Sequence, residues 1–122
     1  MGVCKCDKLP RTFYLDEAPV GWAHDLAQET PGNWKTLRRC PACDRLFSID
    51  VWDKYQDQVV LQIKDRASWE QEADSDDRRK ELLLRSRGGA DDGGCGWVGC
   101  QSARVRGVAY CLDHLWKSGA RR

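Results

Sequence analysis

The chain has 122 residues, of which 41% are apolar and 32% charged, so it has room for one compact domain or two very small ones. No repeat or compositional bias runs through it, which excludes fibrous and low-complexity classes. Twenty basic residues against nineteen acidic ones give a net charge of +1, and no stretch approaches the roughly 18 apolar residues of a membrane helix.

The N-terminal part is predicted to form a small antiparallel sheet. Aromatic and β-branched residues favour the first strand, and alternation of Phe47, Ile49 and Val51 favours a later one. The strands are expected over residues 11–16, 34–39, 46–52 and 58–64.

A short helix is expected within residues 19–29. Trp22, Leu26 and Ala27 would lie on or near one face of it. The turn residues at 30–33, which include Pro31 and Gly32, would end it.

The middle of the chain is predicted to be one helix between irregular segments. The acidic stretch 67–77 is expected to be irregular, and a helix should follow from Ser75 or Asp76 to about Ser86. Acidic residues in its first turn and arginines in its last suit the helix dipole. Gly88 and Gly89 would stop this helix, and residues 90–94 would form a flexible linker.

Seven cysteines are an odd number for a disulfide framework. No apolar region follows the start, so we expect no signal peptide and a reducing, cytoplasmic location, which also disfavours disulfides. With His114 the set becomes eight, enough for two tetrahedral zinc shells. The eight form four close pairs: Cys4 with Cys6, Cys40 with Cys43, Cys95 with Cys100, and Cys111 with His114.

The C-terminal quartet is Cys95, Cys100, Cys111 and His114, with two glycines in the loop between the first two ligands. This arrangement resembles treble-clef and related CCCH zinc fingers. The resemblance implies a knuckle, a hairpin of 101–104 with 107–110, and a helix over 111–118.

The N-terminal quartet would join Cys40 and Cys43 to Cys4 and Cys6. The Cys40–Cys43 segment looks like a zinc-ribbon knuckle, except that Asp44 stands where such knuckles usually have glycine; aspartate tolerates the left-handed conformation better than most residues. A crossed pairing of Cys4 and Cys6 with Cys111 and His114 remains open at this point.

These features predict a small, zinc-stabilised α+β fold with three parts. They are a zinc-ribbon-like module at 1–70, a connecting helix and Gly-rich linker at 71–94, and a CCCH finger at 95–122. Both zinc ions would be structural, because both shells are closed. The whole chain also looks like small uncharacterised bacterial zinc-binding proteins, most clearly from Arg85 to Arg122.

Most of the six tryptophans are expected in the core, where large aromatics suit a small zinc domain. Trp97 is the exception, because it lies between two glycines at the tip of the knuckle loop. We therefore expect Trp97 to be a partner contact.

The charge is unevenly distributed. The C-terminal finger bears Arg104, Arg106, Lys117, Arg121 and Arg122 against one acid, Asp113. A basic surface of this kind can contact nucleic acid, with Arg104 and Arg106 as phosphate contacts. The near-neutral whole argues against that function, because nucleic-acid binders usually have a clear positive excess.

No catalytic motif is present, so we expect a protein without enzymatic activity. The leading hypothesis is a protein-interaction module, of the adaptor, antitoxin or immunity kind by analogy of size. A nucleic-acid-binding regulator is the alternative, and we expect no membrane partner.

Overall fold

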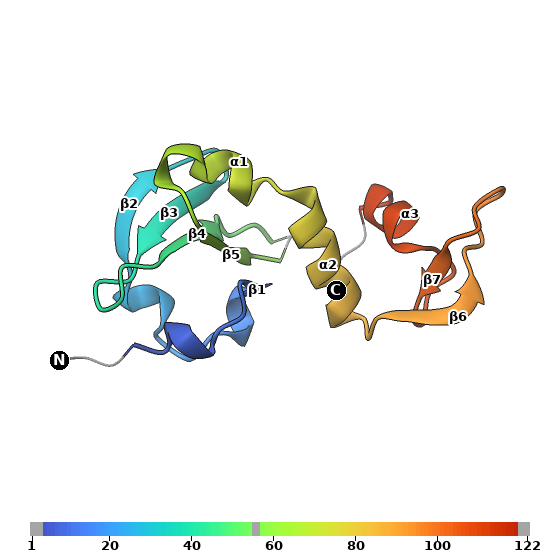
Figure 1. The fold of residues 1–122 in the computed structure, drawn as a ribbon, viewed down its shortest axis with the longest axis horizontal. Helices are drawn as coiled ribbons and strands as arrows, with labels where there is room; N and C mark the ends of the chain where they lie inside the picture. The colour runs from blue at the N-terminus through green and yellow to red at the C-terminus, as the bar shows by residue number, and fades with distance from the viewer. Residues whose placement is uncertain (1–3, 55–56, 120–122) are drawn as a thin grey trace. The chain divides into compact units, whose positions relative to one another are not determined.

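The computed structural model describes residues 4–54 and 57–119 and shows a small α+β protein (Figure 1). The chain divides into two compact units, Met1–Ser75 and Asp76–Arg122. No helix in the described ranges is long and apolar enough to cross a membrane.

The N-terminal unit is built on a five-stranded antiparallel sheet of order β1-β5-β4-β3-β2. The predicted strands are confirmed with shorter bounds, and β2 is an additional edge strand. The strands are β1 (Thr12–Tyr14), β2 (Ala27–Pro31), β3 (Lys35–Arg39), β4 (Leu46–Asp50) and β5 (Val59–Ile63).

Both faces of this sheet are covered. Phe47 and Ile49 of β4 belong to a buried cluster that also contains Phe13 and Trp22. The intervening residue of β4, Ser48, is also fully buried, so the strand has no solvent-facing side at its centre. Figure 1 shows α1 along one side of the sheet and the N-terminal segment along the other. The N-terminal segment includes three short 3-10 turns: η1 (Cys6–Lys8), η2 (Leu15–Glu17) and η3 (Ala23–Asp25).

The prediction of a helix within residues 19–29 is wrong. Only the 3-10 turn η3 forms there, and β2 begins at Ala27. Of the three residues of the expected face, Trp22 and Leu26 are buried but Ala27 is exposed, and extended backbone follows Leu26. Pairing of β2 with β3 therefore overrides the helical spacing.

The acidic stretch expected to be irregular contains the turn η4 (Arg66–Ser68) and the short helix α1 (Trp69–Ala73). Trp69 and Ala73, four positions apart, are buried and anchor α1. Two anchors in five residues are too few to produce a visible sequence period.

The C-terminal unit combines two helices with a two-stranded sheet. Its buried cluster consists of Leu83, Val105 and Leu115, one residue from each of α2, β7 and α3, and partly buried apolar residues pack against it: Leu84, Val108, Leu112 and Trp116. The elements are α2 (Asp76–Ser86), β6 (Ala90–Gly94), β7 (Ala103–Val105) and α3 (Leu112–Lys117). The helix predicted from Asp76 to about Ser86 is thus confirmed, and Gly88 and Gly89 follow it with φ near +90°.

The segment expected to be a linker, 90–94, is instead β6, which pairs antiparallel with β7. The hairpin expected after Cys100 is correspondingly rearranged. β7 takes β6 as its main partner, and on its other side Arg104 bridges to Cys111 and the Val105 amide donates to the Tyr110 carbonyl at 2.8 Å. The turn after β7 has Gly107 at φ +79°, close to the predicted position.

Candidate metal centres

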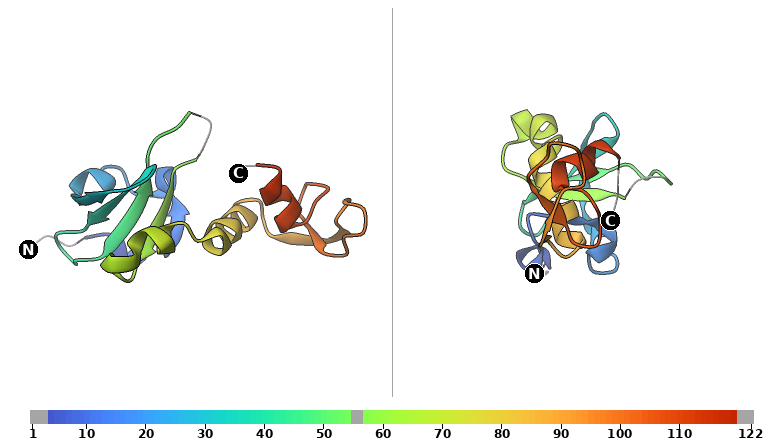
Figure 2. Two further views of the ribbon diagram at one scale, coloured as in Figure 1. Left: turned by 90° about the horizontal axis from the view of Figure 1, so that it is seen from above. Right: turned by 90° about the vertical axis from the view of Figure 1, so that its right-hand side faces the viewer.

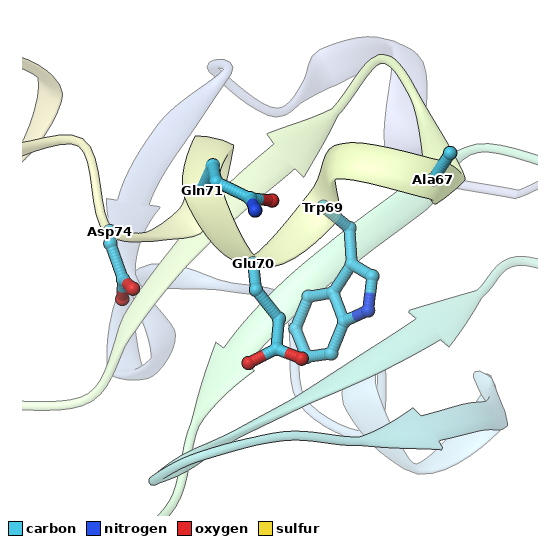
Figure 3. Close-up of a pocket in the computed structure, with 5 residues that line it drawn as sticks. All are labelled: Ala67, Trp69, Glu70, Gln71 and Asp74. Carbon is cyan, nitrogen blue, oxygen red and sulfur yellow. The ribbon is translucent and has the colours of Figure 1, made fainter.

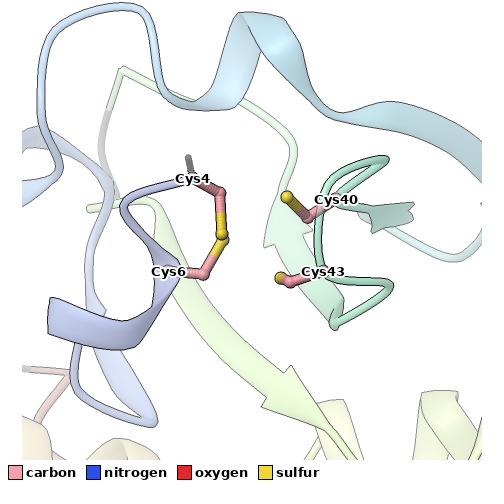
Figure 4. A group of neighbouring side chains, drawn as sticks. All are labelled: Cys4, Cys6, Cys40 and Cys43. Atoms are coloured by element: carbon pink, nitrogen blue, oxygen red, sulfur yellow. The ribbon is translucent and has the colours of Figure 1, made fainter. Parts of the chain in front are cut away.

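The first candidate centre lies in the N-terminal unit and consists of Cys4, Cys6, Cys40 and Cys43. Their sulfur atoms all lie within 4.8 Å of one another. Figure 4 shows Cys4 and Cys6 facing Cys40 and Cys43 from a separate segment of the chain. Cys6 and Cys40 are buried, and the other two are half-buried.

The turn between β3 and β4 sets the position of Cys40 and Cys43. The Cys40 amide donates to the Arg45 carbonyl at 2.9 Å, and the Asp44 amide donates to the Cys40 carbonyl at 2.8 Å. Asp44 has φ +62°, so it occupies the left-handed conformation that glycine adopts most easily. Arg39 donates to the Asp44 carboxylate at 2.8 Å and holds this residue in place.

The sulfur of Cys6 receives a hydrogen bond that the sequence did not reveal. The indole Nε1 of Trp22 lies 3.4 Å from Cys6 Sγ and donates to it. Burial raises the pKa of the Cys6 thiol to about 12, although the Trp22 bond acts in the opposite direction. Such N–H···S bonds stabilise the thiolate that a metal requires.

The pKa of the Cys43 thiol is shifted in the opposite direction to that of Cys6. Burial acts to raise the pKa of its thiol, but the Arg45 backbone amide and the thiols of Cys4 and Cys40 outweigh burial and lower it to about 7. The thiols of Cys6 and Cys43 thus differ widely in pKa although they belong to one group. Protons would remain within the group until a metal displaces them.

The second candidate centre lies in the C-terminal unit and consists of Cys95, Cys100, Cys111 and His114. Their ligand atoms also lie within 4.8 Å of one another. Cys111 is the N-cap of α3 and His114 lies in its first turn, so one helix end presents two ligands. The structure therefore groups Cys111 and His114 with Cys95 and Cys100, and not with Cys4 and Cys6 as in the crossed pairing.

The distances in this centre fit a tetrahedral metal. Zinc lies about 2.3 Å from sulfur and about 2.0 Å from imidazole nitrogen, which gives tetrahedral edges of about 3.8 Å and 3.5 Å. Cys100 Sγ and Cys111 Sγ are 3.8 Å apart. His114 Nδ1 lies 3.3 Å from the sulfurs of both Cys95 and Cys111. Three cysteines and one histidine therefore surround a point suited to a thiolate-binding metal.

The knuckle loop that carries Cys95 and Cys100 is closed by backbone bonds. The Trp97 amide lies 3.5 Å from Cys95 Sγ, and the Cys100 amide donates to the Trp97 carbonyl at 3.0 Å. Burial acts to raise the pKa of the Cys95 thiol, but the backbone amides of Cys111 and Trp97, with His114, lower it to about 6. Cys95 is therefore prepared to bind metal as a thiolate at neutral pH.

Trp97 is partly exposed, as expected, and it also touches the second centre. Its ring stacks on the His114 imidazole at a centroid distance of 4.6 Å and an angle of 11°. Tyr110 meets it edge-on at 6.1 Å. The indole remains 54% exposed, with Val98 beside it fully exposed. Metal ligand and exposed aromatic are thus one rigid group, a coupling that sequence spacing did not suggest.

The predicted phosphate contacts have other partners. Arg104 Nε donates to the Asp91 carboxylate at 2.8 Å, and its guanidinium lies over Gly93. The side chain of Arg106 lies against Gly88. Two further predicted contacts, Arg121 and Arg122, lie outside the described residues.

The tryptophans divide evenly. Trp22 and Trp69 are buried and Trp116 is half-buried, in agreement with the expected core function. The expectation is wrong for Trp34 and Trp52, which are 72% and 69% exposed.

No family model, curated protein or solved structure matches this chain. The two cysteine-rich groups are compatible with structural metal binding, and their assignment depends on their own geometry.

Proposed function

We propose that this chain is a non-catalytic zinc protein that docks onto another protein, with two structural Zn²⁺ ions. The observation that supports it most directly is the convergence of four ligand atoms in each group. Four protein ligands complete a tetrahedral shell and leave no position for a reactive water, whereas catalytic zinc sites have three protein ligands.

Zinc is the metal that this ligand chemistry favours. Cysteine thiolates with at most one imidazole select zinc over the hard cations magnesium and calcium. The C-terminal order of knuckle, strand and helix, with two ligands at the helix start, supports a treble-clef-like type. The turn around Cys40 and Cys43 supports a zinc-ribbon-like type for the other centre.

Trp97 and Val98 are the proposed contact with the partner. They form the tip of the loop between Cys95 and Cys100 and are exposed beside the metal centre. Stacking on His114 fixes the Trp97 ring before binding, and little side-chain entropy would then be lost on docking. Rigid aromatic residues of this kind are typical interface hot spots.

Nucleic-acid binding is the second candidate, because the C-terminal unit has ten basic residues against six acidic ones. Basic residues of this unit are paired internally, for example Arg104 with Asp91, and Lys80 with Asp113 at 3.2 Å. Phosphate contacts would have to compete with these carboxylates, which favours the protein-docking proposal.

The test is affinity purification of the tagged full-length chain from its native cells, with and without nuclease, followed by native mass spectrometry. We expect two zinc ions per chain and a stoichiometric protein that survives nuclease. Trp97→Ala should lose that protein and retain both zinc ions, while Trp97→Phe, which preserves an aromatic ring, should retain both. Loss of all co-purifying material on nuclease treatment would instead support the second candidate.

A further inference from the structure

Trp34 combines an unfavourable backbone with an exposed side chain. It lies in the turn between β2 and β3 with φ +59°, a left-handed conformation that glycine adopts easily and a bulky residue does not. Its indole is 72% exposed, so packing within the described chain does not explain a tryptophan at this position. Strain of this kind is typical of functional positions.

Two more exposed apolar residues lie at the same end of the sheet. The Val51 amide donates to the Trp34 carbonyl at 2.9 Å, which extends the pairing of β3 with β4 beyond Lys35 and Asp50. Val51 and Trp52 then follow β4 with exposed side chains. Figure 2 shows the described residues that follow β4 leading away from the end of that strand. We call Trp34, Val51 and Trp52 the Trp34 patch; it lies at the opposite end of β3 and β4 from the first metal centre.

An acidic hollow contacts Lys35, the residue that follows Trp34 in the chain. The Lys35 side chain is buried, and its Nζ donates to the Asn33 carbonyl at 3.3 Å and to Asp74 Oδ1 at 2.9 Å. Glu70 Oε2 lies 4.0 Å from the same nitrogen. Two carboxylates therefore share one ammonium group, which leaves one net negative charge on this group of three side chains.

These carboxylates line a surface hollow of about 370 Å³ along α1 (Figure 3). The side chains of Asp74 and Glu70 are 67% and 48% exposed, so a ligand can reach them. The ring of Trp69 lies against Gly32 and fixes the turn relative to α1. The hollow is lined by Ala67, Trp69, Glu70, Gln71 and Asp74.

We propose that the Trp34 patch and this hollow form a docking surface for a protein segment that presents an apolar side chain beside an arginine or lysine. The apolar side chain would cover the exposed indole, and the cation would neutralise the charge that Lys35 leaves on Asp74 and Glu70. The N-terminal unit as a whole has ten basic residues against thirteen acidic ones, which suits a basic partner and repels phosphate. This surface belongs to the N-terminal unit and Trp97 to the C-terminal unit, and the proposed function of the surface does not depend on Trp97.

The experiment measures fluorescence anisotropy of labelled octapeptides with the zinc-loaded full chain. One peptide alternates leucine with arginine, a second has glutamate in place of arginine, and a third has glycine in place of leucine. We expect the leucine–arginine peptide to bind at least tenfold more tightly than the other two. Trp34→Gly should weaken it about tenfold or more, and Asp74→Asn severalfold, whereas Val20→Ser, at an exposed valine near Trp22, should change nothing.

Trp34→Gly is suited to this test because glycine fits the backbone at this position. Its melting temperature should be unchanged or a few degrees higher. A large drop in melting temperature would show that Trp34 stabilises the fold, and equal binding of the three peptides would show that the surface does not select a basic apolar segment. Either result overturns the proposal. So does a concentration-dependent dimer that Trp34→Gly abolishes, because the surface would then bind a second copy of the chain. If Trp97→Ala did not lose the co-purifying protein, the proposed function would fail, but the peptide-binding result for the Trp34 patch would not change.

Discussion

The two units differ in how much apolar packing supports each metal centre. Behind the five-stranded sheet of the N-terminal unit, one cluster buries eight residues, with Phe13, Trp22 and Phe47 in edge-to-face contact. The buried cluster of the C-terminal unit consists of Leu83, Val105 and Leu115, with partly buried apolar residues packed against it. Structural zinc contributes about 10–16 kcal/mol in finger peptides, more than three buried aliphatic residues can supply. We therefore expect the fold of the C-terminal unit to depend on metal more strongly than the fold of the N-terminal unit.

The largest expected effect comes from removing one ligand from each centre. Cys111→Ser should abolish the fold of 76–122, because the loss of zinc exceeds the 5–15 kcal/mol that stabilises an ordinary domain. Cys43→Ser should release the N-terminal segment but preserve the paired strands β3, β4 and β5. Amide NMR spectra of the full-length variants would report both outcomes residue by residue. Equal loss of structure in both units would contradict the comparison.

A core truncation sharpens the same comparison. Leu83→Ala removes one of the three residues of the buried cluster in the C-terminal unit and should cost about 3 kcal/mol. Leu61→Ala should cost a similar amount in the N-terminal unit, where Leu61 is fully buried. Because the C-terminal unit has less packing, only Leu83→Ala should also weaken zinc binding at its centre. Chelator competition on each variant would measure this difference.

The metal centres themselves were the most predictable part of the molecule. Cysteine and histidine pairs are visible in a sequence because ligand chemistry restricts the residue type and its spacing. Chain geometry then decides which pairs meet, and the crossed pairing was excluded only when the two groups were seen in separate units. Trp22 was predicted as a core residue, but its bond to Cys6 depends on an indole orientation that no sequence pattern encodes.

Strands rich in buried apolar residues were predictable, because their residue types and spacing are visible in the sequence. The strands β2 and β6 were not predictable in this way. β6 contains two aspartates and two glycines, and it forms because β7 supplies a partner and Cys95 anchors its end. β2 has exposed side chains along most of its length and so lacks a period of two. Elements of this kind are stabilised by tertiary pairing and not by local propensity.

Proton competition should distinguish the two centres. Burial raises the pKa of Cys6 to about 12, and the Cys43 thiol and burial raise that of Cys4 against the Cys6 amide bond. A raised pKa favours the thiol, so the metal must displace its proton, and affinity falls as pH falls, by about tenfold per pH unit for each displaced proton. Each centre also has one thiol with a lowered pKa, about 7 for Cys43 and about 6 for Cys95. In the C-terminal centre the pKa of Cys111 is raised, against the His114 amide bond, by burial and the neighbouring thiols, so that centre has one raised thiol where the N-terminal centre has two.

We therefore expect zinc affinity to fall more steeply between pH 8 and pH 6.5 at the N-terminal centre than at the C-terminal one. Cobalt substitution separates the two, because four thiolates and three thiolates with imidazole give different absorption spectra. Titration of cobalt at several pH values would measure both affinities in one protein. Parallel pH profiles would show that burial of Cys6 does not control metal binding.

The smallest expected effect is a stabilisation within the larger core. Ser48 lies in the middle of the sheet between Leu37 and Leu61, and its hydroxyl has no hydrogen-bond partner among residues 4–54 and 57–119. A buried, unpaired hydroxyl costs about 1–3 kcal/mol, whereas alanine removes one oxygen and leaves only a small void. Ser48→Ala should therefore raise the free energy of unfolding of the N-terminal unit by about 1 kcal/mol.

Ser102→Ala, at an exposed serine of the other unit, is the matched control and should change neither unit. Denaturant unfolding followed by NMR would separate the units. A loss of stability in Ser48→Ala would mean that the hydroxyl is hydrogen-bonded in solution, and the N-terminal core would then be more polar than the comparison assumes.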